Sequence, residues 1–440
     1  MFYPLIFSGI DPVKRTVYTQ ESRTHMTDIA AVVRVLVILL LIALTVILLT
    51  RRLAVPYTLG LVVVGLLISI FEWLPDLHLT PALILFVFLP ALLFEGSWMI
   101  ETTYLRKHWP TIFLLAGPGL LVSLVLIAVP LHFFAGLDWG VAFLLSTILS
   151  PTDPVAVLGL FRQLKVDVHI STIIEGESLF NDGVAGSLYQ TFLAVVLLST
   201  HAQSTSGVQS WLNGILLFLL EVGGGALTGL ACGFLISRLV KLIDDPLIET
   251  TITVVTAYGV YLLADALHTS GILALILAGL LLGSYGRRIG MSKQTLEAVD
   301  NFWSMIAFLA NALLFLLVGV ELNPLRFISS TSALPLLLTA GLVIVAVLLA
   351  RLVVVLILPL ITQLPIALSS WGAVPHSWRV VIFWSGLRGA LSLALVLALP
   401  LDIPHRDTLV FATYAVVLFT LLVQGFSLRW ILRRLPSVSR

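Results

Sequence analysis

The sequence predicts an all-α polytopic membrane protein with about 13 transmembrane helices. Hydrophobic residues make up 59% of the 440 residues and charged residues only 11%, a balance typical of membrane proteins. Apolar runs of about 20 residues, the length that crosses a bilayer as a helix, recur along the whole chain. Basic residues also gather in alternate loops. Membrane lipid is therefore an expected partner, and a formal net charge of +1 with no basic cluster indicates no nucleic-acid partner.

The chain divides into three expected segments. Residues 1–28 form a polar N-terminal segment, residues 29–428 the transmembrane domain, and residues 429–440 a short cytoplasmic tail. The first apolar run is longer than the hydrophobic part of a signal peptide and has no clear cleavage site, so it is expected to be retained. The spans are expected at 29–50, 54–74, 81–100, 111–134, 140–161, 173–198, 211–236, 247–267, 270–285, 302–320, 333–361, 380–400 and 408–428.

The basic residues predict the orientation, because short cytoplasmic loops collect Lys and Arg. With the N-terminus outside, most basic residues fall in inner loops. These are Arg51, Arg52, Arg106, Lys107, Arg162, Lys165, Arg238, Lys241, Arg287, Arg288, Lys293, Arg379 and the arginines after Leu428. Beyond the N-terminal segment, the outer loops receive only Arg326 and Arg406. The C-terminus is then cytoplasmic, and the expected location is the plasma membrane or the bacterial inner membrane.

Two spans carry helix breakers near their centres. Span 5 contains Ser-Pro-Thr-Asp-Pro at 150–154, and span 12 contains Ser-Gly-Leu-Arg-Gly at 385–389. Because these spans are seven apart, they should cross the membrane in opposite directions, as in an inverted repeat of spans 1–6 and 8–13 with span 7 as linker. Asp153 and Arg388 are suited to neutralise the helix ends exposed at the two breaks.

Span 6 adds a polar strip at the same depth. Residues four apart share a helix face, so Ser178 lies with Asp182, and Glu177 lies with Asn181. An ionised side chain is costly in the bilayer unless it faces protein, water or an ion. Oxygen ligands of this kind suit a small hard cation. The sequence therefore indicates a path for a transported ion.

In these segments the chain resembles the monovalent cation/proton antiporters, specifically the NhaP-type sodium/proton exchangers. The matching segments are 150–154, 177–183 with its Asn-Asp pair, 89–96 with Glu95, Arg351 in span 11, and 386–390. Their order along the chain also matches, and together they cover the membrane domain. The resemblance implies the antiporter fold, with two discontinuous helices that cross in spans 5 and 12.

The resemblance also implies a function for individual residues. It implies that Asp182 binds either a proton or a sodium ion, with Thr152 and Ser178 as further sodium ligands, while alternating access exposes the site to one side at a time. It implies that Glu177 pairs with Arg351. The transported ions are Na⁺ and H⁺, and no cofactor is expected.

Further implications concern the coupling and the assembly. Asn181, in place of a second aspartate, resembles the electroneutral branch, which exchanges one cation for one proton. The family is dimeric, with spans 1–3 and 8–10 at the interface, so a homodimer is expected. Glu95 is expected near the inner end of span 3, either as part of a cytoplasmic funnel or as an ordinary interfacial carboxylate.

Alternatives remain at this point. Thr152 and Ser178 could instead satisfy the broken backbone, and Asp153 could be purely structural. The solute could be lithium, potassium or another solute carried with protons, and a cation channel is a second class of function. An enzyme is not expected, because the sequence has no paired histidines, cysteine cluster, nucleophile elbow or nucleotide fingerprint.

Overall fold

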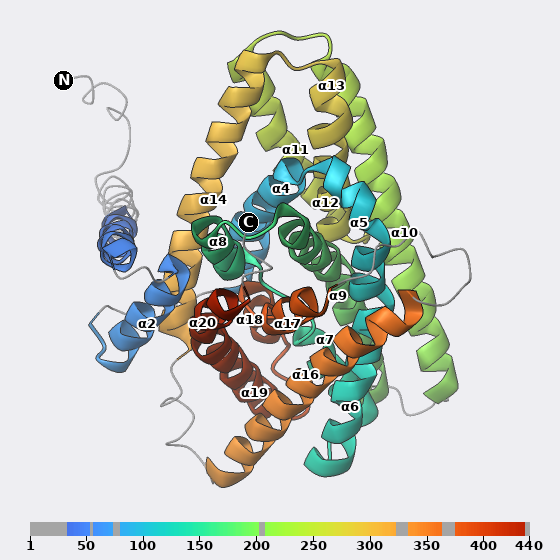
Figure 1. The fold of residues 1–440 in the computed structure, drawn as a ribbon. Coiled ribbons are helices and arrows are strands. Elements are labelled where there is room, and N and C mark those ends of the chain that lie inside the picture. The colour runs from blue at the N-terminus through green and yellow to red at the C-terminus, as the bar shows by residue number, and fades with distance from the viewer. Residues whose placement is uncertain are drawn as a thin grey trace, which may run out of the picture.

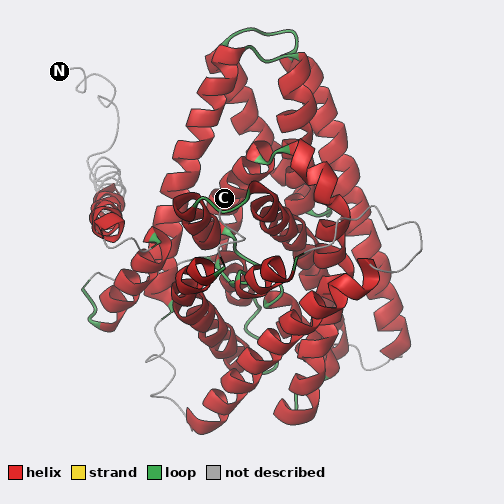
Figure 2. Ribbon diagram, in the orientation of Figure 1, coloured by secondary structure: helices red, strands yellow, loops and turns green. Residues whose placement is uncertain are grey.

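The computed structural model describes residues 33–52, 56–73, 80–201, 207–322, 333–362 and 375–435. The polar segment expected at 1–28 lies outside these ranges. All regular elements within the described ranges are helices joined by short loops (Figures 1 and 2). The expectation of an all-α fold is therefore confirmed.

The first helix is Val33–Arg52. The following elements, in chain order, are α2 Tyr57–Ile70, α3 Pro81–Leu83, η1 Ile84–Phe88, α4 Leu89–Met99, α5 Thr102–Leu114, η2 Leu115–Gly119, α6 Leu120–Ala135, α7 Trp139–Ile148, α8 Val155–Leu164 and α9 Val168–His201. The second half contains α10 Gly207–Val240, α11 Pro246–Ala266, α12 Gly271–Leu281, η3 Leu282–Gly286, α13 Arg287–Ile289, α14 Lys293–Glu321, α16 Ala333–Thr362, α17 His376–Trp384, α18 Ala390–Leu397, α19 Arg406–Phe419, η4 Thr420–Gly425 and α20 Phe426–Arg434. The η elements are single wide π-helical turns within longer helices.

Nine helices of the described ranges are long and apolar enough to cross a membrane, and α2, α7 and α8 are shorter apolar helices. α9 is not among the nine, although it is 34 residues long. It carries Glu175, Glu177 and Asp182, which lower its hydropathy. The helix that departs most from a plain membrane span is thus the one with the polar strip.

Several helix boundaries differ from the expectation, among them the start of α14, which lies at Lys293 instead of residue 302. Span 4 was expected to begin at residue 111, but α5 begins at Thr102 and the helix continues without a break to Ala135. It passes through Pro110 and Pro118, the second of which lies in the wide turn η2. Neighbouring helices and such wide turns allow a membrane helix to accommodate proline. At the other end of the chain, α20 continues to Arg434, so part of the expected tail is helical.

Small residues bring helices together within the molecule. α2 and α14 pack side by side (Figure 1). A Cβ on Gly65 would lie 2.2 Å from the Leu316 carbonyl oxygen, and one on Gly319 would lie 2.3 Å from that of Val62. A similar contact joins α10 and α12, where a Cβ on Gly229 would lie 2.2 Å from the Ala274 carbonyl oxygen. Such close backbone contacts are typical of membrane helices, which gain little from the hydrophobic effect between them.

The outer surface of α10 is apolar. Leu219, Leu220, Leu227 and Leu235 are each at least 60% exposed. A row of exposed leucines is unfavourable in water but is well solvated by lipid. This surface therefore indicates that α10 faces a bilayer.

The two broken spans run in opposite directions, as expected. α7 begins beside the end of α6, where the Trp139 ring stacks on His132 with 4.2 Å between ring centroids. α17 begins at the other end of the same long helix, where Trp378 contacts His108 of α5. At that end His108 Nε2 also lies 2.9 Å from His169 Nδ1 at the start of α9. The two breaks therefore meet from opposite sides of the molecule.

Candidate functional site

Both broken spans lose their helical structure where the sequence carries Pro or Gly. α7 ends at Ile148 and α8 begins at Val155, while α17 ends at Trp384 and α18 begins at Ala390. Proline cannot donate a backbone hydrogen bond, so Pro151 and Pro154 interrupt the first of these helices. The two interruptions touch directly, because the Asp153 amide donates to the Leu387 carbonyl at 2.8 Å.

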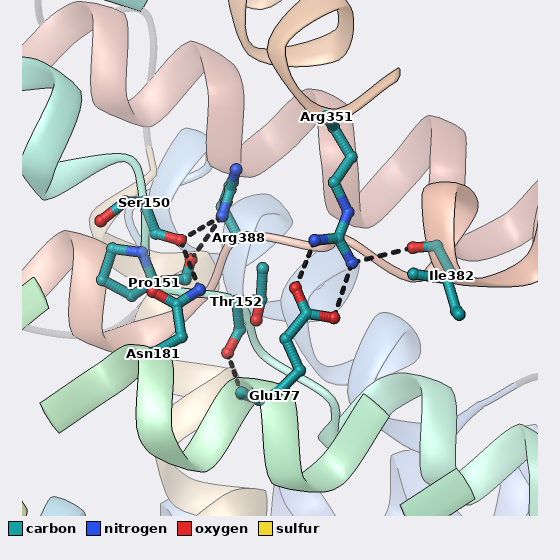
Figure 3. A network of polar contacts seen from close by, with 9 residues as sticks. Ser150, Pro151, Thr152, Glu177, Asn181, Arg351, Ile382 and Arg388 are labelled. Atoms are coloured by element: carbon teal, nitrogen blue, oxygen red, sulfur yellow. Dashed lines mark hydrogen bonds and ion pairs between the residues drawn. The ribbon is translucent and has the colours of Figure 1, made fainter. Parts of the chain in front are cut away.

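Arg388 caps the end of α7. Its Nη1 donates to the carbonyl oxygens of Ser150, at 2.5 Å, and Pro151, at 3.1 Å (Figure 3). A helix C-terminus carries partial negative charge on its free carbonyls, and the guanidinium neutralises it. Arg388 is held in turn by its backbone amide, which donates to Thr420 Oγ1 at 3.1 Å.

Asp153 caps helix starts on the other side of the crossing. Its Oδ1 accepts from the Val155 amide at 3.0 Å, at the start of α8. Its carboxylate also accepts from the Ala390 amide, at the start of α18. Gly389 allows this approach, because a Cβ there would lie 2.0 Å from Asp153 Oδ2. Asp153 thus lies at two helix starts and Arg388 at a helix C-terminus.

Glu177 and Arg351 form a buried ion pair between α9 and α16. Arg351 Nη1 donates to Glu177 Oε1, and Nη2 donates to Oε2 at 2.9 Å (Figure 3). Arg351 Nη2 also donates to the Ile382 carbonyl of α17 at 2.9 Å. The two-pronged contact uses both carboxylate oxygens and ties three helices together.

Two further residues of α9 bind the broken backbone. Asn181 Nδ2 donates to the Ser150 carbonyl at 2.9 Å (Figure 3). Ser178 Oγ donates to the Thr152 carbonyl. These bonds fix the loop between α7 and α8 against α9. They also satisfy the backbone, as the structural alternative for Ser178 anticipated.

Asp182 lies beside these groups, and one of its carboxylate oxygens makes no hydrogen bond. It is 8% exposed, and its Oδ1 has no hydrogen-bond partner among the described residues. It lines a cavity of about 110 Å³, here called the crossing cavity, together with Thr152, Asp153 and Ser178. The charges that act on it most strongly are those of Asp153 and Arg388. A buried carboxylate oxygen without a partner is unusual, because leaving it so is costly.

The crossing cavity contains two polar residues that the sequence analysis did not select. They are Glu175 of α9 and Asn311 of α14, and they line the cavity together with Glu95 of α4, which the sequence analysis did name. Glu175 is seven residues before Asp182 and four before Leu179, so helical periodicity alone would have placed it on the Asp182 face. Asn311 is a single amide within an apolar run, and such a polar residue could have been selected from the sequence as a candidate site residue.

The cavity offers oxygen atoms of several kinds. Asp182 supplies a carboxylate, and Ser178 and Thr152 supply hydroxyl groups. Because the Ser178 proton is used in its bond to Thr152, its oxygen lone pairs remain to accept a cation. Oxygen atoms such as these suit hard cations. A carboxylate can also take up a proton instead, so the same atoms can hold either ion.

Known proteins match both the sequence and the fold. The family described as "Sodium/hydrogen exchanger, transmembrane" matches residues 37–434. The low-affinity Na⁺/H⁺ antiporter NhaS1 of Synechocystis sp. is 37% identical over 385 residues, which are 87% of this chain and 70% of that protein. The Na⁺/H⁺ antiporter NhaH of Halobacillus dabanensis is 34% identical over 412 residues, 92% of this chain and 98% of the relative.

A solved structure is similar in fold. The sodium proton antiporter MjNhaP1 from Methanocaldococcus jannaschii at pH 8 superposes with a TM-score of 0.72. The superposition covers 92% of this chain and 99% of that one, at 17% sequence identity. This likeness confirms the predicted antiporter fold.

Proposed function

This chain belongs to the sodium/hydrogen exchanger family, and from this premise we propose that it is a secondary active transporter. It exchanges Na⁺ for protons across the cell membrane. The observation that carries the proposal is the unpartnered Oδ1 of Asp182 in the crossing cavity. Asp153, Glu177, Arg351 and Arg388 each have a protein partner at the crossing, whereas this oxygen is left for a ligand.

Exchange follows from competition at Asp182. The carboxylate binds a proton or a sodium ion, and each excludes the other because both neutralise the same charge. Ser178 and Thr152 act as further sodium ligands from the crossing cavity. Thr152 lies on the non-helical backbone between α7 and α8, which can rearrange with little loss of helical hydrogen bonds, whereas Ser178 and Asp182 lie on the continuous helix α9.

A 1:1 exchange fits the charges around the site. Asn181 is an amide whose Nδ2 donates to Ser150, so it adds no exchangeable proton. The Asp153 carboxylate is used by the amides of Val155 and Ala390. Of these three residues, Asp182 then remains as the exchanging carboxylate, which supports electroneutral transport.

Transport requires the site to open to each side in turn. We propose that the bundle with the broken helices moves against the helices of spans 1–3 and 8–10, and that two copies of the chain assemble through the latter. The expected orientation places the N-terminus outside and the C-terminus in the cytoplasm. Chemical crosslinking in native membranes and protease accessibility of tagged termini test the assembly and the orientation.

The decisive experiment uses sealed proteoliposomes with a trapped pH dye. An imposed Na⁺ gradient should move protons in the opposite direction in the wild type, and Asp182→Asn should abolish this movement. Glu221→Gln is the matched control, because this buried carboxyl on α10 does not line the crossing cavity. It should transport as the wild type does.

Other outcomes revise or overturn the proposal. Proton movement with K⁺ or Li⁺ alone would keep the mechanism and change the substrate. Cation conductance that is independent of the proton gradient would indicate a channel. Retained exchange in Asp182→Asn would remove the carboxylate from its proposed role.

A further inference from the structure

A cavity separate from the crossing cavity lies between α5 on one side and α10 and α12 on the other. This cavity, here called the lateral cavity, has a volume of about 540 Å³. Its lining residues come from α5, α10 and α12 and from the elements η3 and α13 that follow α12 (Figure 1). None of them lines the crossing cavity. A volume of this size can hold a sizeable organic ligand.

The walls of the lateral cavity are apolar and open toward the bilayer. On α10, Leu230 is 47% exposed and Phe234 is 45% exposed. On α12, the wall contains Leu277, Leu280 and Leu281. Because α10 faces the bilayer, an acyl chain can enter this cavity sideways from the lipid and remain in apolar surroundings.

Two arginines line the same cavity from opposite sides. Arg106 is on α5 and Arg288 is on α13, and both are exposed. Within the described part of the chain, no ion pair involves either of them, whereas the neighbouring Arg287 is paired with Asp300. The lining residues include no carboxylate, and Tyr285 adds a hydroxyl group. The polar part of the cavity therefore favours an anion.

A third guanidinium is held next to the cavity. The Tyr285 ring stacks on Phe234, with 6.0 Å between ring centroids. The Arg238 guanidinium lies over the same Phe234 ring, 5.2 Å from its centroid. This cation–π contact keeps a further positive charge close to the residues that line the cavity.

The combination of apolar walls and basic residues identifies the chemistry of the ligand. A small soluble anion would leave the leucines uncovered, and a neutral apolar molecule would leave the arginines unpaired. An anionic phospholipid satisfies both, because a guanidinium forms strong hydrogen bonds with a phosphate. Arg106, Arg238 and Arg288 all lie in loops expected on the cytoplasmic side, where basic pockets between membrane helices bind anionic headgroups.

We propose that the lateral cavity binds one anionic phospholipid, with its phosphate between Arg106 and Arg288 and an acyl chain along the leucines of α10 and α12. The role of this site rests on the proposed function. α5 belongs to the bundle that is proposed to move, and α12 belongs to the helices against which it moves. A lipid that contacts both favours the conformation in which the two arginines flank it, so the anionic lipid regulates exchange.

The first test measures lipid binding without transport. Native mass spectrometry of the purified protein compares dioleoyl phosphatidylglycerol with dioleoyl phosphatidylcholine, which has the same acyl chains. The wild type should bind phosphatidylglycerol more tightly. Arg106→Gln combined with Arg288→Gln should weaken this binding by about ten-fold, equivalent to about 1.4 kcal/mol, and leave phosphatidylcholine binding unchanged.

The matched control removes the same charge elsewhere. Arg52→Gln combined with Arg433→Gln changes two exposed arginines that do not line the lateral cavity. This control should bind phosphatidylglycerol as the wild type does. An equal loss in the two double variants would mean that general surface charge attracts the lipid, and it overturns the site.

A third variant distinguishes a lipid from a free phosphate. Leu230→Trp fills the apolar part of the cavity and keeps both arginines. If gel filtration and the melting temperature show it to be folded, it should weaken phosphatidylglycerol binding as strongly as the loss of the arginines. Unchanged binding in Leu230→Trp, or displacement of the lipid by millimolar glycerol 3-phosphate, overturns the assignment to a phospholipid.

The second test measures regulation in proteoliposomes. The exchange rate of the wild type and of the Arg52→Gln, Arg433→Gln control should change as phosphatidylglycerol replaces phosphatidylcholine. The rate of the Arg106→Gln, Arg288→Gln variant should not depend on this replacement. The same dependence in all three proteins overturns the regulatory role. Since lipid binding is measured without Na⁺/H⁺ exchange, failure of this site is distinguishable from failure of the proposed function.

Discussion

Glu177 and Asp182 are buried carboxylates on the same helix, α9, yet their surroundings differ completely. Glu177 is 2% exposed and uses both oxygens in its contact with Arg351. Asp182 is 8% exposed and keeps Oδ1 free beside a cavity. The difference teaches that a buried charge in this fold serves the structure when it is paired, and is left for a ligand when it is not.

The physical basis is the cost of a charge in a medium that solvates it poorly. A paired charge is stable only while its partner remains, so loss of the partner should be strongly destabilising. An unpaired carboxylate already bears that cost, which a proton or a cation relieves when it binds. Substitution of Glu177 should therefore lower stability, whereas substitution of Asp182 should abolish transport and change stability little.

The largest loss of stability is expected from Glu177→Ala. It strands the buried Arg351 guanidinium, and the expected cost is about 3–5 kcal/mol of unfolding free energy. Thermal unfolding of the purified protein in detergent measures it. As a control, Glu177→Leu combined with Arg351→Met removes both charges and should recover much of the loss. A melting temperature of Glu177→Ala equal to that of the wild type would contradict a structural role for the pair.

A smaller loss is expected from Gly389→Ala. The new methyl group would lie 2.0 Å from Asp153 Oδ2 and push the carboxylate away from the helix starts that it caps. Overpacking of this kind typically costs about 1–3 kcal/mol. Gly159→Ala in α8 is the matched control, because no atom lies within 4 Å of a Cβ there. Comparable melting of the two variants would show that the contact with Asp153 is unimportant.

Ser178→Ala should have a modest effect on stability and a clear effect on sodium. It removes one hydrogen bond to the Thr152 carbonyl, worth about 0.5–1.5 kcal/mol. It also removes a proposed sodium ligand, so the KM for Na⁺ should rise while the melting temperature falls only slightly. Steady-state exchange in proteoliposomes measures the KM. If the KM does not change, Ser178 supports only the backbone.

The smallest change in stability is expected from Asp182→Asn, the variant expected to abolish exchange. The amide replaces a buried, unpartnered carboxylate and carries no charge, so the unfolding free energy should stay within about 1 kcal/mol of the wild type or rise. Thermal unfolding under the same conditions as for Glu177→Ala gives a direct comparison. A large destabilisation would mean that Asp182 has a structural partner after all.

Much of the crossing could be predicted from the sequence. Proline at 151 and 154 and glycine at 386 and 389 indicated the two breaks, because these residues act on the backbone locally. The capping roles of Asp153 and Arg388 followed from the sign of their charges. Helix ends were predicted less well, as the continuation of α5 through Pro110 shows, because neighbouring helices and wide turns decide whether a proline ends a helix.

Two polar residues of the crossing cavity were missed for a different reason. Glu175 stood next to a stronger motif, and Asn311 was a single amide in an apolar span. Neither residue is informative until Glu95, Glu175 and Asn311 are known to line the same cavity. Convergence of three helices depends on how they pack, and the spacing of residues along one helix does not contain it.

The sequence by itself determined that this chain is a helical membrane protein, where two of its helices break, and which carboxylates lie at the depth of the breaks. Those properties follow from local backbone preferences and from the cost of charge in lipid, which act on each segment separately. The family resemblance had implied that Glu177 pairs with Arg351, but only the tertiary structure decided which oxygens find partners: both oxygens of Glu177 contact Arg351, whereas Oδ1 of Asp182 stays free. Arg351 is 174 positions away from Glu177 in the chain, and whether residues so far apart meet is a matter of contact in space.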